Sequence, residues 1–271
     1  MKELEQIYEM YKHIVHENPD DYNQQFIKNE NDCYFELSPD TGKLVQKTHY
    51  YDEHNNEFTI NARFYTYLNS LRKFNGFPSV ISDMDFFRLQ ADRVFHGFRD
   101  IRHGKSLLSD FNYHHGNKGS FGTHFSDNPS EAFIYTENNQ YEKDKNRIME
   151  AKILPGKYIN MLHLSIIGDA IERSDDEFRE SSIYNRFKND VYKIKDFFKQ
   201  HESDGFMIES FKRTLLNNQI LATLLGFDYI IHNMSSNNNH YIVLNRNKFA
   251  VSTDEYNRFY GENSTENISE K

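Results

Sequence analysis

Three histidines lie in short runs whose residue pattern is that of β-strands, each close to residues that could share a binding site. His96 precedes Gly97 in the run VFHGF, and His124 lies two residues before Ser126 in GTHFS. His240 opens the run HYIVLN near the end of the chain. An imidazole can accept or donate a proton near neutral pH. These positions are therefore candidates for acid–base or hydrogen-bonding roles toward a ligand.

Other patterns of reactive residues fit known sites less well. His103, His114 and His115 could bind zinc, but no carboxylate follows at helical spacing, and adjacent histidines project in different directions. Residues 116–119 (GNKG) lack the lysine spacing and the following helix of a phosphate-binding loop. Cys33 is the single cysteine, which excludes an internal disulfide and favours an ordinary strand residue. We therefore expect no metal site.

The composition indicates a globular protein with a polar surface. The chain has 271 residues, a net charge of −9 and a mean hydropathy of −0.83, and 37% of its residues are hydrophobic. No apolar run approaches the roughly 20 residues that span a bilayer, so no membrane association is expected. The N-terminus carries charges where a signal peptide would be apolar, which predicts a cytoplasmic location. The net acidity argues against a broad surface for nucleic acid.

Residues 88–124 depart from this overall acidity. They contain six Lys or Arg residues, three acidic residues and five of the 13 histidines. Two interpretations are open: the segment is a solvated loop, or it forms a local pocket for an anionic ligand such as a pyrophosphate.

The residue periodicities predict an α+β protein in three parts. Residues 1–90 form a mainly helical region with a β-hairpin around residues 39–42. Residues 91–252 form a domain of short strands and helices, in which Pro129 begins a helix and residues 233–239 are a loop between the last two strands. Residues 253–271 are predicted to be a flexible acidic tail.

The periodicities also predict several local features. The first helix carries an apolar face, Ser82 caps a short helix that runs to about Ala91, and Gly226 ends an apolar helix as its C′ residue. The residues of the first apolar face are Leu4, Ile7, Tyr8, Tyr11, Ile14 and Val15. A later helix is expected to pack through Phe187, Val191, Ile194 and Phe198.

Three motifs in a fixed order resemble the ADP-ribosyltransferase superfamily. They are residues 94–98 (VFHGF), 122–135 (GTHFSDNPSEAFIY) and the pair of strands within 224–246 (LLGFDYII and HYIVLNR). The family has a strand with Arg-Gly or His-Gly, then Gly-x-Tyr-Phe-Ser or -Ala before a helix with Ala-x-x-Tyr, and a last strand such as Glu-Tyr-Ile-Val. The ending also resembles that of ADP-ribosyltransferase domains encoded by bacteriophages. The resemblance covers about residues 90–252.

This resemblance implies a split-sheet fold that binds NAD as its substrate and transfers ADP-ribose to a macromolecule, as a bacterial or phage effector or toxin. His96 would contact the ribose, the Gly97 backbone the nicotinamide amide, and Tyr135 would stack on the nicotinamide ring. The implied NAD-binding residues are His96, Gly97, Thr123, Phe125, Ser126 and Tyr135, and the implied catalytic residues are His96, His124 and His240. Because the first and last motif strands are expected to be neighbours, His240 should share a cleft with His96 and Tyr135.

Two positions depart from the family pattern. His124 replaces an aromatic residue, and His240 replaces the catalytic Glu of most active members. A histidine adds no fixed negative charge against the oxocarbenium-like transition state. Either the mechanism differs or another carboxylate enters the site, with Glu131, Glu150 and Glu209 as candidates.

Several alternatives for function remain open. His124 gives a weaker likeness to RNA 2′-phosphotransferases, although Ser120 and Phe121 stand where that family has an arginine. The acceptor could thus be RNA or DNA as well as protein. An NAD glycohydrolase, with water as acceptor, and a catalytically silent NAD-binding module are further alternatives. Residues 1–90 would recognise the target, cover the site or bind a neutralising antitoxin.

Overall fold

The computed structural model divides the chain into two compact units, each assembled from segments far apart in the sequence. Unit 1 comprises residues 1–72, 114–121 and 159–227, and unit 2 comprises residues 73–113, 122–158 and 228–271. The structure describes residues 2–17, 33–37, 44–48, 56–57, 60–74, 78–97, 122–134, 148–235 and 238–261. This division differs from the predicted boundary at residue 90, because the helices after residue 160 share a core with the N-terminal helices.

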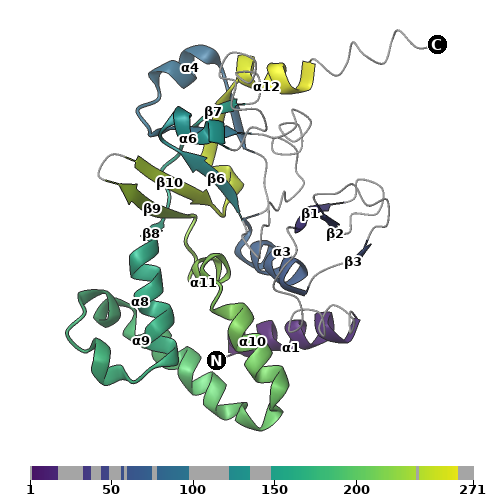
Figure 1. The fold of residues 1–271 in the computed structure, drawn as a ribbon, viewed down its shortest axis with the longest axis vertical. Helices are drawn as coiled ribbons and strands as arrows, with labels where there is room; N and C mark the ends of the chain where they lie inside the picture. The colour runs from purple at the N-terminus through teal and green to yellow at the C-terminus, as the bar shows by residue number, and fades with distance from the viewer. Residues whose placement is uncertain are drawn as a thin grey trace. The chain divides into compact units, whose positions relative to one another are not determined.

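Unit 1 is mainly helical. Its α-helices, labelled in Figure 1, are α1 (Lys2–Glu17), α3 (Ile60–Arg72), α8 (Met161–Glu172), α9 (Ser182–Gln200), α10 (Phe206–Leu215) and α11 (Asn218–Leu224). Two short 3₁₀ helices, η2 (Asp175–Phe178) and η3 (Glu202–Asp204), complete its helical part. A three-stranded sheet is formed by β1 (Cys33–Leu37), β2 (Leu44–Thr48) and β3 (Asn56–Glu57). β1 and β2 pair antiparallel, which confirms the predicted hairpin.

Apolar and aromatic side chains form the core of unit 1. The predicted apolar face of α1 is confirmed, since all six of its residues are buried. The ring of Phe211 contacts the rings of both Tyr8 and Tyr11. The hydroxyls of the two tyrosines bond to polar groups. Tyr11 Oη lies 2.5 Å from Ser210 Oγ, and Tyr8 Oη donates to Asp204 at 3.0 Å. Both rings are therefore buried without leaving a hydroxyl that lacks a hydrogen bond.

Two later helices of unit 1 can be compared with the features predicted for them. The buried face of α9 contains Val191 and Ile194 as predicted, but Phe197 replaces Phe198, which is only half-buried. Gly226 has a φ of +77°, the left-handed conformation expected of a glycine after a helix, so its predicted role is confirmed. Among the described helices, none is long and apolar enough to cross a membrane.

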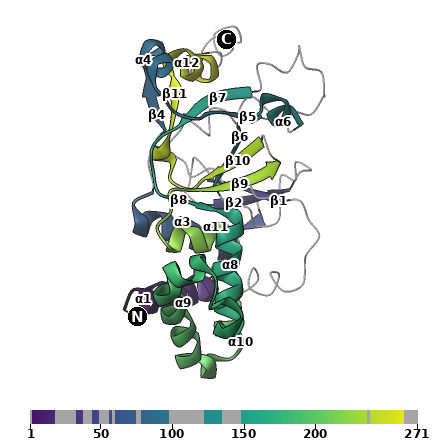
Figure 2. The same ribbon diagram turned by 90° about the vertical axis from the view of Figure 1, so that its left-hand side faces the viewer.

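A mixed sheet organises unit 2. In the described residues, eight strands lie in the order β4-β11-β7-β5-β6-β10-β9-β8. They are β4 (Ser79–Ile81), β5 (Arg93–Gly97), β6 (Thr123–Ser126), β7 (Ile148–Ile153), β8 (Tyr158–Asn160), β9 (Tyr229–Ser235), β10 (Asn238–Val243) and β11 (Phe249–Ser252). Figure 2 shows β5, β6, β10 and β9 side by side. With the helices, this sheet confirms the α+β class. In the described residues it is one eight-stranded mixed sheet and not the split sheet that the resemblance implies.

Short helices accompany this sheet. They are α4 (Asp83–Arg88), α6 (Pro129–Ile134), η4 (Arg246–Lys248) and α12 (Thr253–Gly261). Ser82 caps α4 as predicted, since its Oγ accepts from Asp85 N at 3.1 Å, although the helix ends at Arg88, before Ala91. At its other end, Lys152 Nζ donates to the carbonyls of Phe86 and Leu89, where a helix C-terminus favours a cation.

The pleat divides the central strands of unit 2 between two faces. The core face carries the buried side chains Val94, Phe125, Met149, Ala151, Tyr241 and Val243. The opposite face, here named the His240 face, carries Phe95, Ser126 and His240, because Ser126 pairs directly with both other residues. Directly paired residues of adjacent strands project to the same side of a sheet.

Two predictions about the C-terminal part are wrong. Residues 253–261 form α12, whose Phe259 is buried in the core, so the chain does not become a flexible tail at residue 253. Residues 262–271 lie outside the described residues. The predicted loop at 233–239 is also too long, since β9 extends to Ser235 and β10 begins at Asn238.

The backbone at Gly122, directly before β6, requires glycine on two grounds. Its φ is +85°, and a Cβ there would lie 2.9 Å from the carbonyl oxygen of Val243. We expect Gly122→Ala to destabilise the protein by more than the roughly 1–2 kcal/mol that an L-residue costs at positive φ. Gly226→Ala is the control, since φ is also positive there and no atom lies within 4 Å of the added Cβ. Equal melting temperatures of the two variants would contradict a steric role for Val243.

Candidate functional site

The site is built where β6 ends and α6 begins. Asn128 caps the helix, since its Oδ1 accepts from Ser130 N at 2.9 Å and its carbonyl accepts from Glu131 N at 3.1 Å. Pro129 takes the first helical position, which confirms the predicted helix start. This short turn brings Glu131 back over the end of β6, where Ser126 pairs with His240.

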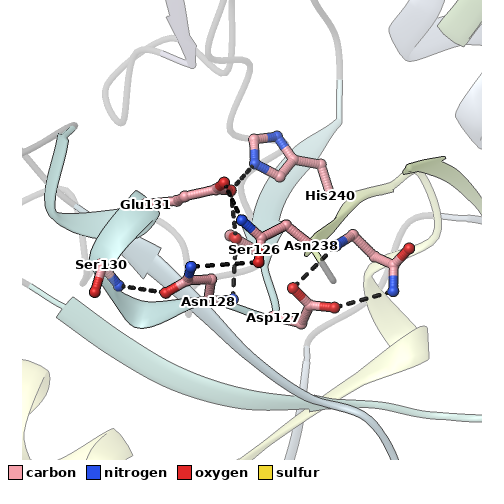
Figure 3. Close-up of polar contacts among 8 residues, drawn as sticks. Ser126, Asp127, Asn128, Ser130, Glu131, Asn238 and His240 are labelled. Atoms are coloured by element: carbon pink, nitrogen blue, oxygen red, sulfur yellow. Dashed lines mark hydrogen bonds and ion pairs between the residues drawn. The ribbon is translucent and has the colours of Figure 1, made fainter. Parts of the chain in front are cut away.

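Glu131 is the centre of the polar cluster in Figure 3. Its Oε2 accepts a hydrogen bond from Ser126 Oγ at 2.9 Å and lies 2.5 Å from His240 Nε2. Its Oε1 accepts from Asn238 Nδ2 at 2.7 Å. The side chains of Glu131 and His240 are 24% and 20% exposed. The carboxylate is thus held by three side chains from β6 and β10 and is still accessible from solvent.

These contacts favour the ionised form of Glu131. The hydrogen bond from His240 lowers the pKa of the Glu131 carboxyl most strongly, while burial opposes it and the bonds from Ser126 and Asn238 lower it further. Glu131 therefore carries a fixed negative charge at neutral pH.

Only one of the three candidate carboxylates reaches His240. Glu150 lies on β7 and forms an ion pair with Arg93, whose Nε and Nη2 both bond to it at 2.5 Å. Glu209 is exposed on α10, in unit 1. Glu131 is therefore the carboxylate that the structure brings to position 240.

The expectation that His96 shares a cleft with His240 is wrong. Phe95 pairs with Ser126, so His96, the next residue, points to the core face. His96 is 6% exposed, its Nδ1 contacts the backbone oxygen of His124, and its ring meets Phe125 edge-on with centroids 5.7 Å apart. In addition, β6 lies between β5 and β10, so the first and last motif strands are not neighbours. The structure thus makes His96 a buried core residue.

The other implied NAD-binding residues are divided by the sheet. His124 pairs with Ile242 and lies half-buried on the His240 face. Gly97, two residues after Phe95 on the same strand, is buried. Thr123 and Phe125 are buried on the core side. Tyr135 lies outside the described residues, as do His103, His114 and His115.

Part of the third motif serves the fold. Asp228 is buried, and its carboxylate accepts from Lys157 N at 2.7 Å and from Asn245 Nδ2 at 2.6 Å. Its backbone carbonyl accepts from Leu244 N and Asn245 N, both at 2.9 Å. A Cβ at Gly156 would lie 2.8 Å from Asp228 Oδ2. Asp228 therefore connects the start of β9 with the end of β10.

The sequence analysis missed the asparagines that complete the site. Asn238 contacts Glu131, and Asn239 bonds to Asp127 through its N (2.9 Å) and Nδ2 (3.0 Å). Both lay in the predicted loop. Their proximity to His240 in the sequence was the one available signal.

Similarity to known proteins assigns no role to the residues of this site. No family model matches the sequence, and no curated protein or solved structure matches the chain. In the part of the chain that the structure describes, no group of three or more His, Cys, Asp or Glu side chains is arranged to hold a metal ion.

Burial of His96 predicts that its removal affects stability. His96→Ala deletes a ring packed on Phe125 and should lower the free energy of unfolding by about 2–4 kcal/mol, the usual cost of a core cavity. His124→Ala, at a half-buried position of the neighbouring strand, should cost clearly less. Denaturant unfolding of both variants checks this, and equal losses would show that His96 is not a core residue.

The lowered pKa of Glu131 predicts a pH-dependent contribution to stability. A carboxyl whose pKa is lower in the folded state stabilises above its unfolded value, about 4.3, and loses this contribution as pH falls through the folded value. The difference in unfolding free energy between wild type and Glu131→Gln should be about 1 kcal/mol or less near neutrality and shrink below about pH 4. A difference that stays constant from pH 7 to pH 3 would contradict the ionised, hydrogen-bonded carboxylate.

Proposed function

We propose that this chain is an NAD-dependent mono-ADP-ribosyltransferase that modifies a macromolecule, with Glu131 as its catalytic carboxylate. The observation that carries the proposal is the contact of the Glu131 carboxylate with both Ser126 and His240. The family resemblance places these two positions at the nicotinamide ribose. Glu131 supplies there the negative charge that the histidine at position 240 lacks.

The chemistry requires that charge. When the bond between the ribose C1′ and the nicotinamide nitrogen breaks, its electron pair leaves with nicotinamide, and positive charge develops on the ribose. A fixed, ionised carboxylate beside the ribose stabilises this transition state without reorganisation. The acceptor then forms the new bond to C1′, and its proton passes to the His240–Glu131 pair or to water. Glu131 can therefore supply this charge although position 240 holds histidine and not glutamate.

The His240 face carries the side chains that the proposal assigns to NAD binding. The three motifs occupy β5, then β6 with α6, then β9 and β10, and these four strands are consecutive in the sheet. Gly97 is buried, and the half-buried His124 lies on this face beside Ser126. This adjacency supports the proposal, which assigns His124, Ser126, Glu131 and His240 to the site and no longer includes His96.

The remaining parts of the assignment belong to the same proposal. NAD is the substrate, and the acceptor is a protein or a nucleic acid encountered by a bacterial or phage effector. The N-terminal region would recognise that acceptor or bind an antitoxin. An RNA 2′-phosphotransferase-like reaction, hydrolysis of NAD and silent NAD binding are the alternatives against which the proposal is tested.

Two labels on NAD separate these functions. Release of labelled nicotinamide by the purified protein distinguishes an enzyme from a silent NAD-binding module. With the label in the adenine moiety and cell lysate as acceptor, protease-sensitive label indicates transfer to protein and nuclease-sensitive label indicates transfer to nucleic acid. Nicotinamide release without macromolecular label indicates a glycohydrolase.

Substitution of single carboxylates tests the catalytic assignment. Glu131→Gln should lower the rate of nicotinamide release by roughly 100-fold or more, as loss of a transition-state electrostatic contact does. Glu150→Gln is the matched control. Glu150 is also a carboxylate, it lies on β7 opposite Phe95, and it pairs with Arg93 instead of His240. It should remain within a few-fold of wild type. The reverse order of the two effects would move the catalytic carboxylate to Glu150.

A further inference from the structure

The amide of Asn238 is held at both ends. Its Nδ2 donates to Glu131 Oε1 at 2.7 Å, and its Oδ1 accepts from Asn128 Nδ2 at 3.3 Å. Because one end must donate and the other accept, the two contacts fix the orientation of the amide. Ser126 and His240 contact only the other oxygen of Glu131. Asn238 is therefore the described residue that restrains Oε1.

The backbone also fixes the position of Asn238. The pairing of β10 with β9 shifts between Asn238 and Asn239, which pair with Ser235 and Asn233. Such an irregularity changes the direction of a side chain and is often found beside functional sites. Asp127 then holds Asn239 by three hydrogen bonds, two to its carboxylate and one from its own N to the Asn239 carbonyl at 3.1 Å. Asn238 thus pairs with Ser235 of β9, and the next residue, Asn239, is anchored by Asp127 directly after β6.

We propose that Asn238 is a positioning residue, which holds the Glu131 carboxylate in the orientation that the reaction uses. The inference rests on the proposed function for its catalytic consequence and on the contacts of Oε1 for its structural part. With Oε1 bound to Asn238 and Oε2 bound to Ser126 and His240, rotation of the carboxylate would break a hydrogen bond at each oxygen. A carboxylate held in this way is ready to face the developing charge.

In the described residues, the contact to Glu131 Oε1 comes from the uncharged amide of Asn238 and not from a charged group. His240 faces it from β10, and Asp127, directly after β6, is bonded to Asn239. On β5 and β7, Arg93 and Glu150 bond to each other. A neutral amide donor stabilises the carboxylate without neutralising its charge.

Removal of the amide donor tests this inference by a measurement that does not need turnover. In protein labelled with ¹³C at the Glu side chains, the resonance of Glu131 is assigned with Glu131→Gln and titrated. We expect Asn238→Ala to raise the pKa of Glu131, and Asn238→Asp to raise it more, because the loss of a donor and the addition of a like charge both disfavour the ionised form. Asn247→Asp, the same change at an exposed position of η4, should leave the pKa unchanged.

Kinetics supply the second readout. With NAD as substrate, the Asn238 variants should lower kcat by roughly tenfold to a hundredfold with KM within a few-fold, as misplacement of a catalytic group does. Asn238→Gln, which keeps the amide, should recover part of the loss. An unchanged Glu131 pKa in folded Asn238→Ala and Asn238→Asp would overturn the inference. A raised pKa with a wild type that releases no nicotinamide would support the positioning of Glu131 and reject the proposed function.

Discussion

The pairing of Ser126 with two partners is the constraint on which the site depends. Since β6 lies between β5 and β10, Phe95, Ser126 and His240 must share one face, and their neighbours in the sequence must project to the other. A slip of one residue in either pairing would exchange the two faces. The buried core on the opposite side, centred on Phe125 and Tyr241, holds this register in place.

Much of the fold could be predicted because local periodicity reports burial directly. The apolar face of α1, the cap at Ser82 and the glycine at position 226 each depend on a few consecutive residues. What could not be predicted depends on distant partners. Residues 253–261 are polar on average, and their helix is held against the sheet by the buried Phe259 and by Tyr256. The grouping of the helices after residue 160 with α1 likewise required the three-dimensional core.

The candidate site was predicted only in part, for a related reason. An ordered set of motifs identifies which strands carry a site but not which face of each strand is used. The implied residues included consecutive pairs such as His96 and Gly97, although neighbouring residues of a strand project to opposite sides. Glu131 was one of three candidate carboxylates, and only the turn from β6 into α6 selects it. Asn238 was not predicted as part of the site, because the sequence predicts a loop there, whereas the residue begins β10.

The distance in sequence between Glu131 and His240 has a consequence for when the site comes into existence. The two residues are 109 positions apart, so β10 is synthesised well after α6. A nascent chain that has already formed α6 holds the carboxylate but has neither the imidazole nor the asparagine that complete the cluster. Long-range pairing of this kind is slow to form, because the entropy cost of closing the intervening chain comes before the contacts that reward it. The completed arrangement of charges therefore arises only after β10 has been synthesised and has joined the sheet.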